Sequence, residues 1–169
     1  MKIPLLKLFI LVFFAGAGIN AKSVTTKKAT TIILVRHAEK ATTGGNNPEL
    51  SAEGKQRAER LRASFPGVEP DGFYSTTYIR TQQTLAPWAK QTSKEIEFYD
   101  AAKQREFAEL LLKQTGKTIV VAGHSNTIPG LVNLLLKEEK FQNLADNEYD
   151  KIFVVTIVNN KPAIKVMTY

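Results

Sequence analysis

The chain has 169 residues, of which 43% are hydrophobic and 23% are charged, a composition typical of one globular domain. It contains no cysteine, which excludes disulfides and a lipid anchor attached to a cysteine. The formal net charge of +7 favours anionic partners, but the lysines and arginines form no basic block with interleaved aromatic residues, so we expect no nucleic acid partner.

The first 21 residues have the pattern of a secretory signal peptide. Two lysines accompany the apolar run Leu8–Phe14, and small residues follow until polar sequence begins after Ala21. The run is too short to span a bilayer. We therefore predict a signal peptide (1–21), a polar flexible leader (22–30) and a domain (31–169), with periplasmic or secreted localisation and no stable membrane anchor after cleavage. An uncleaved membrane anchor is the alternative.

Continuous apolar runs then alternate with helical patterns, which predicts a mostly parallel sheet covered on both faces. In chain order, the predicted elements are strand Thr31–Val35, helix Leu50–Phe65 with Ser51 as its cap, strand Gly72–Ser75, helix Ile79–Gln91 bent or interrupted at Pro87, strand Glu95–Tyr99, helix Gln104–Thr115, strand Thr118–Gly123, helix Ile128–Lys137 and a hairpin around Asn159-Asn160. The expected class is a three-layer α/β/α sandwich.

The two histidines of the chain each follow a predicted core strand. His37 comes after ILVR, and His124 comes after VVAG. Because ligands of open parallel sheets bind at the carboxyl ends of the strands, we expect both imidazoles at one rim, with Arg36 beside them. The stretch YSTTYIRTQQT (Tyr74–Thr84) places Arg80 where another strand passes into a helix. Taken singly, each histidine could be structural and Arg80 could pair with a surface carboxylate.

Three stretches, LVRHAEK, STTYIRTQQT and VAGHSNTIP, together resemble the histidine phosphatase superfamily, also known as the phosphoglycerate mutase-like fold. The Arg-His-Gly/Ala motif of that family corresponds to Arg36-His37-Ala38, its helix-start arginine to Arg80, and its second histidine to His124 after Gly123. The segment LSAEGKQRAERL is similar to the family's first helix. The resemblance implies a phosphoglycerate mutase-like domain, with the C-terminal hairpin at the edge of the sheet.

The resemblance also implies chemistry on phosphate monoesters, which carry about −1.5 to −2 charges near neutral pH. Arg36 and Arg80 would neutralise that charge with their planar guanidinium groups. His37 would attack phosphorus while its other ring nitrogen donates to a carbonyl group. A protonated His124 would stabilise the transferring oxygens, and Ser125 is a further expected substrate-binding residue.

The proton donor for the leaving group is not identified by the sequence, and Asp100, Glu106 and Glu39 stay open as candidates. Ser125 occupies the position where the acid-phosphatase branch has an aspartate. The loop Ala41–Glu49 could also contact substrate, although plain turn chemistry is the simpler interpretation. We expect no metal or other cofactor, because two histidines without cysteines or paired acids make a poor zinc site.

Short connections between the predicted elements leave little chain for a lid, so an open pocket and hydrolysis are expected rather than a mutase reaction. The expected function is that of an exported phosphohydrolase that cleaves small phosphate monoesters through a phosphohistidine on His37. Two alternatives stay open: a protein phosphohistidine phosphatase, which the small size favours, and a non-catalytic phosphate- or anion-binding protein.

Overall fold

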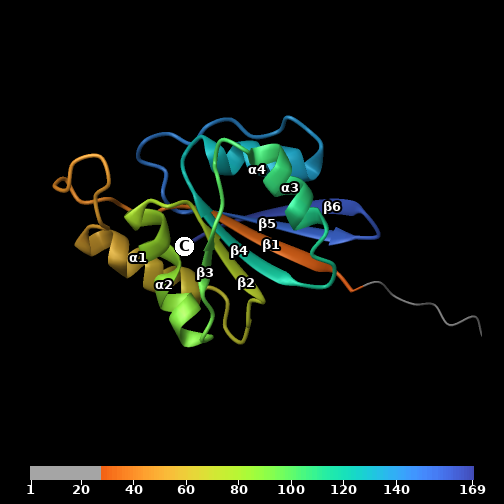
Figure 1. Ribbon diagram of the computed structural model, residues 1–169, viewed down its shortest axis with the longest axis horizontal. Helices are drawn as coiled ribbons and strands as arrows, with labels where there is room; N and C mark the ends of the chain where they lie inside the picture. The colour runs from red at the N-terminus through yellow and green to blue at the C-terminus, as the bar shows by residue number, and fades with distance from the viewer. Residues whose placement is uncertain (1–27) are drawn as a thin grey trace, which may run out of the picture.

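The computed structural model describes residues 28–169, and Figure 1 shows their arrangement. The elements are β1 (Thr30–Arg36), α1 (Ala52–Ala63), β2 (Gly72–Ser75), α2 (Ile79–Gln91), β3 (Ile96–Phe98), α3 (Gln104–Leu112), β4 (Thr118–Gly123), α4 (Thr127–Leu136), β5 (Lys151–Val158) and β6 (Lys161–Thr168). The predicted signal peptide and the leader up to residue 27 lie outside the described residues.

The strands form one six-stranded sheet in the order β3-β2-β4-β1-β5-β6. Neighbouring strands from β3 to β1 run parallel, whereas β5 is antiparallel to β1 and β6 is antiparallel to β5. The predicted three-layer class and the hairpin at the sheet edge are confirmed. The expectation of a mostly parallel sheet is partly wrong, because the hairpin gives the β1 side of the sheet antiparallel pairing.

Helices cover both faces of the sheet, with α3 and α4 on one side and α1 and α2 on the other (Figure 1). Alternate residues of β1 enter different cores: Ile32 and Leu34 pack in the first, and Ile33 and Val35 pack in the second. Side chains of a strand point alternately to its two faces, so a strand buried on both faces needs a continuous apolar run. This explains the sequence TIILV.

Several element ends differ from the predictions by one to three residues, and two of these differences meet at the turn around Gly116. The helix α3 ends at Leu112 rather than Thr115, because the chain then turns toward Gly116, whose φ is +74°. Strand β1 begins at Thr30, one residue into the predicted leader. The Thr30 hydroxyl donates to the carbonyl of Gln114 and accepts from the amide of Gly116, so it docks the start of β1 on this turn. Pro87 lies inside α2, which continues past it.

The start of α1 is packed directly against the segment that follows β1. The Ser51 hydroxyl accepts from the amide of Gly54, as the predicted cap requires. A Cβ atom on Gly54 would overlap the carbonyl oxygen of Glu39, so only glycine permits this approach. The Arg57 guanidinium lies 2.6 Å from the Glu39 carboxylate and also donates to the carbonyl of Tyr169. These contacts fix the chain two residues after His37.

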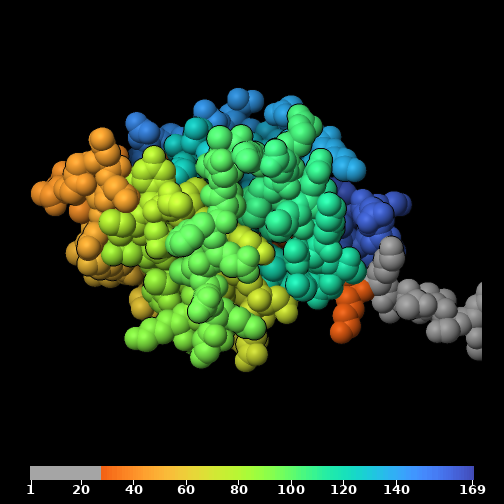
Figure 2. Space-filling view, viewed as in Figure 1, coloured from red at the N-terminus to blue at the C-terminus, as the bar shows by residue number. Residues whose placement is uncertain are grey.

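Across residues 28–169, none of the helices has both the length and the apolar character needed to cross a membrane. The loop between β1 and α1, Ala41–Glu49, protrudes from the body of the molecule and is orange at the left of Figure 2. It is tied down at Asn47, whose side-chain oxygen accepts the amide of Ile79 at 2.9 Å. Asn47 therefore satisfies a free amide at the start of α2.

Candidate active site

Parallel pairing of β1 with β4 brings the two histidines together. Arg36 is in register with Gly123, so the chain leaves both strands at the same level, and the amide of His37 donates to the carbonyl of Gly123 at 2.8 Å. The ring centroids of His37 and His124 are 5.5 Å apart, with the rings edge to face. The expected placement of both imidazoles at one rim of the sheet is what the structure shows.

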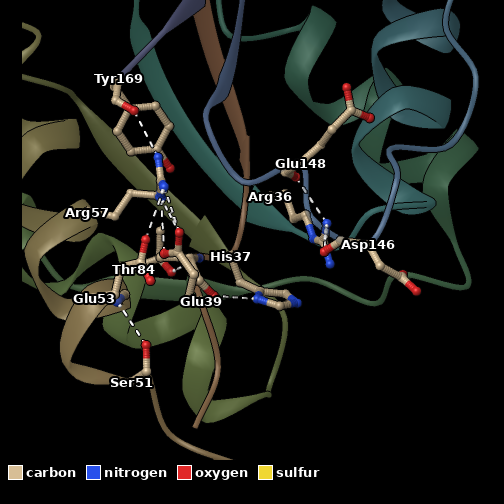
Figure 3. Close-up of polar contacts among 12 residues, drawn as sticks. Arg36, His37, Glu39, Ser51, Glu53, Arg57, Thr84, Asp146, Glu148 and Tyr169 are labelled. Carbon is tan, nitrogen blue, oxygen red and sulfur yellow. Dashed lines mark hydrogen bonds and ion pairs between the residues drawn. The ribbon is translucent and has the colours of Figure 1, made fainter.

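His37 is held in one orientation by its neighbours. Its side chain is buried, and Nδ1 lies 2.8 Å from the carbonyl oxygen of Ala38 (Figure 3). A carbonyl can only accept a hydrogen bond, so Nδ1 carries the proton and Nε2 keeps its lone pair. The amide of Ala38 in turn donates to the Thr84 hydroxyl, which donates to the carbonyl of Arg80. Helix α2 thereby fixes the peptide that orients the imidazole.

Arg36 is buried beside the histidine and is fastened to the loop before β5. Its Nη1 atom donates to the carbonyls of Ala145, Asp146 and Glu148 at 2.8, 3.1 and 3.0 Å (Figure 3). The guanidinium carbon lies 4.0 Å from the centroid of the Tyr149 ring, a cation–π contact. Nε of Arg36 is buried and has no partner among the described residues. This loop was not identified from the sequence as part of the site, because it holds the arginine through backbone carbonyls, which any residue type can supply.

Arg80 and His124 both contact the aromatic ring of Tyr78. The Arg80 guanidinium carbon lies 4.2 Å from the centroid of the Tyr78 ring, which meets the His124 ring edge to face at 5.0 Å. Nε of Arg80 is also buried without a partner in the described part of the chain. The Thr76 hydroxyl lies 3.1 Å from His124 Nε2 and 2.8 Å from the Thr81 hydroxyl. Tyr78 and Thr76 sit inside the stretch that pointed to Arg80 but were not selected from it.

The environment holds both imidazoles neutral. Burial lowers the pKa of His37 to about 3, and the nearby charges of Arg80 and Arg36 add to this against the opposing hydrogen bond of Ala38. Burial, followed by the same two guanidinium charges, lowers the pKa of His124 to about 4. In the free protein at neutral pH, His124 is therefore neutral, and its expected protonation during phosphoryl transfer stays a prediction. The two positive charges beside it disfavour a third.

Two serines near the histidines lie in different surroundings. Ser125 is half-buried next to His124, and its carbonyl accepts the amide of Leu144 at 2.9 Å. Ser75 is buried and donates to the carbonyl of Thr76, so its hydroxyl supports the turn rather than a ligand. The residues 28–169 include no cluster of three or more histidine, cysteine, aspartate or glutamate side chains placed to hold a metal ion.

The structure also distinguishes the three candidate proton donors by their contacts. The Glu39 carboxylate is engaged by Arg57 at 2.6 Å, which makes it a supporting group. Glu106 is exposed on α3 and lines a surface hollow with Tyr74. Asp100 is exposed and lines the same hollow, and it also lines a second cavity that includes Thr76, the residue that contacts His124. Of the three carboxylates, Asp100 is the one that shares a cavity wall with a residue in contact with His124.

The depressed histidine pKa values predict a loss of stability on mild acidification. Between pH 7 and pH 5, an unfolded imidazole with its ordinary pKa of 6.5 gains a proton, whereas the folded His37 does not, so stability falls as the pH falls. The His37→Gln variant should lose about 2 kcal/mol less unfolding free energy over this interval than the wild type. Urea denaturation at both pH values measures this. Equal losses in the two proteins would contradict the neutral, buried His37.

Comparison with known proteins finds a family model that matches part of the chain. Residues 32–110, which include Arg36, His37 and Arg80, match the family model for the histidine phosphatase superfamily (branch 1). No protein of curated function matches the sequence. Several solved structures share the fold, but their low sequence identity to this chain supports a common fold and no more.

One such structure is the protein histidine phosphatase SixA complexed with tungstate (16% identity, TM-score 0.64, covering 82% of this chain and 96% of that chain). Another, assigned as phosphohistidine phosphatase SixA from Nakamurella multipartitia, has 19% identity and a TM-score of 0.64, covering 84% and 97%. Phosphoserine phosphatase from Entamoeba histolytica in complex with 3-phosphoglyceric acid has 21% identity and a TM-score of 0.61, covering 83% and 97%. With its motif residues gathered at one rim of this fold, the chain resembles the histidine phosphatase superfamily over residues 32–110 and shares the fold of these solved structures.

Proposed function

We propose that this protein hydrolyses phosphate monoesters through a phosphohistidine formed on His37. The observation that carries the proposal is the meeting of a buried guanidinium (Arg36) and a half-buried one (Arg80) with an imidazole whose Nε2 is unprotonated. Each guanidinium keeps a buried Nε–H without a partner among the described residues, and such donors are costly unless a ligand accepts from them. A phosphoryl group offers the oxygen acceptors and negative charge that this arrangement lacks.

The first chemical step is attack of His37 Nε2 on phosphorus. A new N–P bond forms as the P–O bond to the leaving group breaks, and the electron pair of that bond goes to the leaving oxygen. Arg36 and Arg80 stabilise the charge on the three remaining phosphoryl oxygens. Because Arg36 is fastened by three carbonyls, it is already oriented before substrate arrives, and little reorganisation is needed.

His124 changes its role when the substrate binds. In the free protein its pKa of about 4 keeps it neutral, chiefly through burial and then through the arginine charges. A bound phosphate offsets those positive charges and so raises the pKa of His124 in the complex. The imidazole can then carry a proton toward the transferring oxygens. In the second step, water attacks the phosphohistidine, the N–P bond breaks, and inorganic phosphate is released.

A second candidate substrate is a phosphohistidine side chain of another protein. The likeness to structures described as SixA phosphohistidine phosphatases favours it, and so does the lack of a carboxylate bonded to either histidine among the described residues. A phosphoramidate needs less help from an acid than an alkyl ester does. Turnover of a phosphohistidine peptide, measured beside small phosphate esters, separates the two candidates.

Trapping of the covalent intermediate tests the proposal. The chain has only two histidines, so a phosphohistidine can form at just two positions. After mixing with a labelled phosphate monoester and rapid denaturation at alkaline pH, the wild type should carry label on His37. The His37→Gln variant should show no label and at least a 10³-fold lower kcat, because the nucleophile is absent.

The matched control is His124→Gln, which removes the other imidazole and leaves His37 in place. This variant should still accumulate label on His37, at a lower rate. Label on His124 in the wild type, or undiminished turnover by His37→Gln, would overturn the assignment of the nucleophile. Binding of phosphate by all three proteins without turnover by any would favour the non-catalytic anion-binding alternative.

We propose in addition that the protein is exported, on the strength of the signal-like pattern in residues 1–21. Production of the full chain in a Gram-negative host should yield periplasmic protein whose intact mass corresponds to an N-terminus at Lys22. A control variant, Phe13→Asp, breaks the apolar run and should retain the uncleaved chain in the cytoplasm. Full-length wild-type protein in the cytoplasmic fraction would contradict export.

A further inference from the structure

A cavity of about 390 Å³ has two wall residues that contact His124. Its wall includes Thr76, which contacts His124 Nε2 at 3.1 Å, and Tyr78, whose ring meets the His124 ring. The cavity continues to Phe98 and Asp100, at the end of β3. Its volume falls within the range of small-molecule sites. Asp100 is one of the candidate proton donors, whereas Phe98 was not selected from the sequence.

The position of the cavity fits the part of the substrate that leaves. In phosphoryl transfer, the attacking atom and the leaving atom lie roughly in line on opposite sides of phosphorus. The attacking atom is His37 Nε2, and the cavity residues Thr76 and Tyr78 contact the other histidine, 5.5 Å away between ring centroids. A leaving group that points from His37 toward His124 would lie next to Thr76 and Tyr78, the residues through which this cavity adjoins His124.

The chemistry of the wall selects among leaving groups. Phe98 is 58% exposed and Tyr78 is 41% exposed, and both line the cavity. Aromatic side chains in a cavity wall allow a planar group to pack against them. Among the described residues that line the cavity, Asp100 is the one with a charge. A carboxylate there attracts a cationic or hydrogen-bond-donating group and repels an anion.

We infer that this cavity is a leaving-group subsite selective for planar aromatic groups that are neutral or cationic. The inference rests on the proposed function, because it assigns the part of the same substrate that is released. It predicts that phosphate esters whose leaving group carries a carboxylate or a second phosphate are poor substrates. Phe98 and Asp100 are the specificity-determining residues, and the phosphate itself is held by the guanidinium groups.

Two substrate pairs test the subsite without a difference in leaving-group reactivity. Benzyl phosphate and cyclohexylmethyl phosphate release alcohols of similar acidity but differ in planarity, and the wild type should favour the benzyl ester about 5-fold in kcat/KM. Similarly, 4-(aminomethyl)benzyl phosphate should exceed 4-carboxybenzyl phosphate about 10-fold at low ionic strength, with a smaller ratio in added salt.

Variants assign each preference to one side chain. Phe98→Leu keeps apolar bulk and should abolish the benzyl preference, whereas Asp100→Asn should abolish the charge preference. The matched control is Leu110→Ala, which alters another exposed apolar side chain, on α3 and outside the cavity wall, and should leave both ratios unchanged. Wild-type ratios near one, or ratios that persist in Phe98→Leu and Asp100→Asn, would overturn the inference.

Non-hydrolysable ligands separate this inference from the proposed function. Benzylphosphonate and cyclohexylmethylphosphonate contain a P–C bond, so their dissociation constants, measured by calorimetry, report the cavity even without turnover. Tighter binding of benzylphosphonate by the wild type, lost in Phe98→Leu, supports the subsite whether or not any ester is cleaved. Turnover of esters together with equal binding of both phosphonates would reject the subsite and retain the phosphatase. If neither phosphonate binds, the result would contradict both the subsite and the proposed phosphatase function.

Discussion

The parallel pairing of β1 with β4 is the constraint on which the site depends. With Arg36 in register with Gly123, both chains turn away from the sheet at the same level, and the amide of His37 bonds to the carbonyl of Gly123. The two imidazoles are separated by 87 positions along the chain but by 5.5 Å between ring centroids. A shift of two residues in this register would separate the rings by about 6 to 7 Å more along the strand direction.

Positive charge is the second condition, and the protein supplies it before any substrate arrives. Each guanidinium is packed on a tyrosine ring, Arg36 on Tyr149 and Arg80 on Tyr78. These contacts and the carbonyls around Arg36 hold two cations close to the histidines. Burial and, to a lesser extent, the charges of these two arginines keep both imidazoles unprotonated. His37 can therefore act as a nucleophile while the two guanidinium charges are available to bind phosphate.

Sequence patterns predicted the fold well where a strand is buried on both faces or a motif is local. The bounds of β2, β4 and α2 agree with the predictions, and His37, His124 and Arg80 gather at one rim as expected. The clamp on Arg36 could not be predicted, because its donors meet backbone carbonyls of a loop more than 100 residues away, which any sequence can provide. The low pKa of His124 in the free protein could not be predicted either, because it depends on burial and on Arg36 and Arg80 together, which no local pattern reveals.

The central claim is that two guanidiniums and two imidazoles surround one phosphate-sized anion. A crystal structure of the wild type with bound tungstate tests it most directly. The account predicts one anion with its oxygens within hydrogen-bond distance of Arg36 and Arg80, and with His37 Nε2 directed at the tungsten atom. An anion bound elsewhere, or one at this rim that His37 Nε2 does not face, would contradict the account.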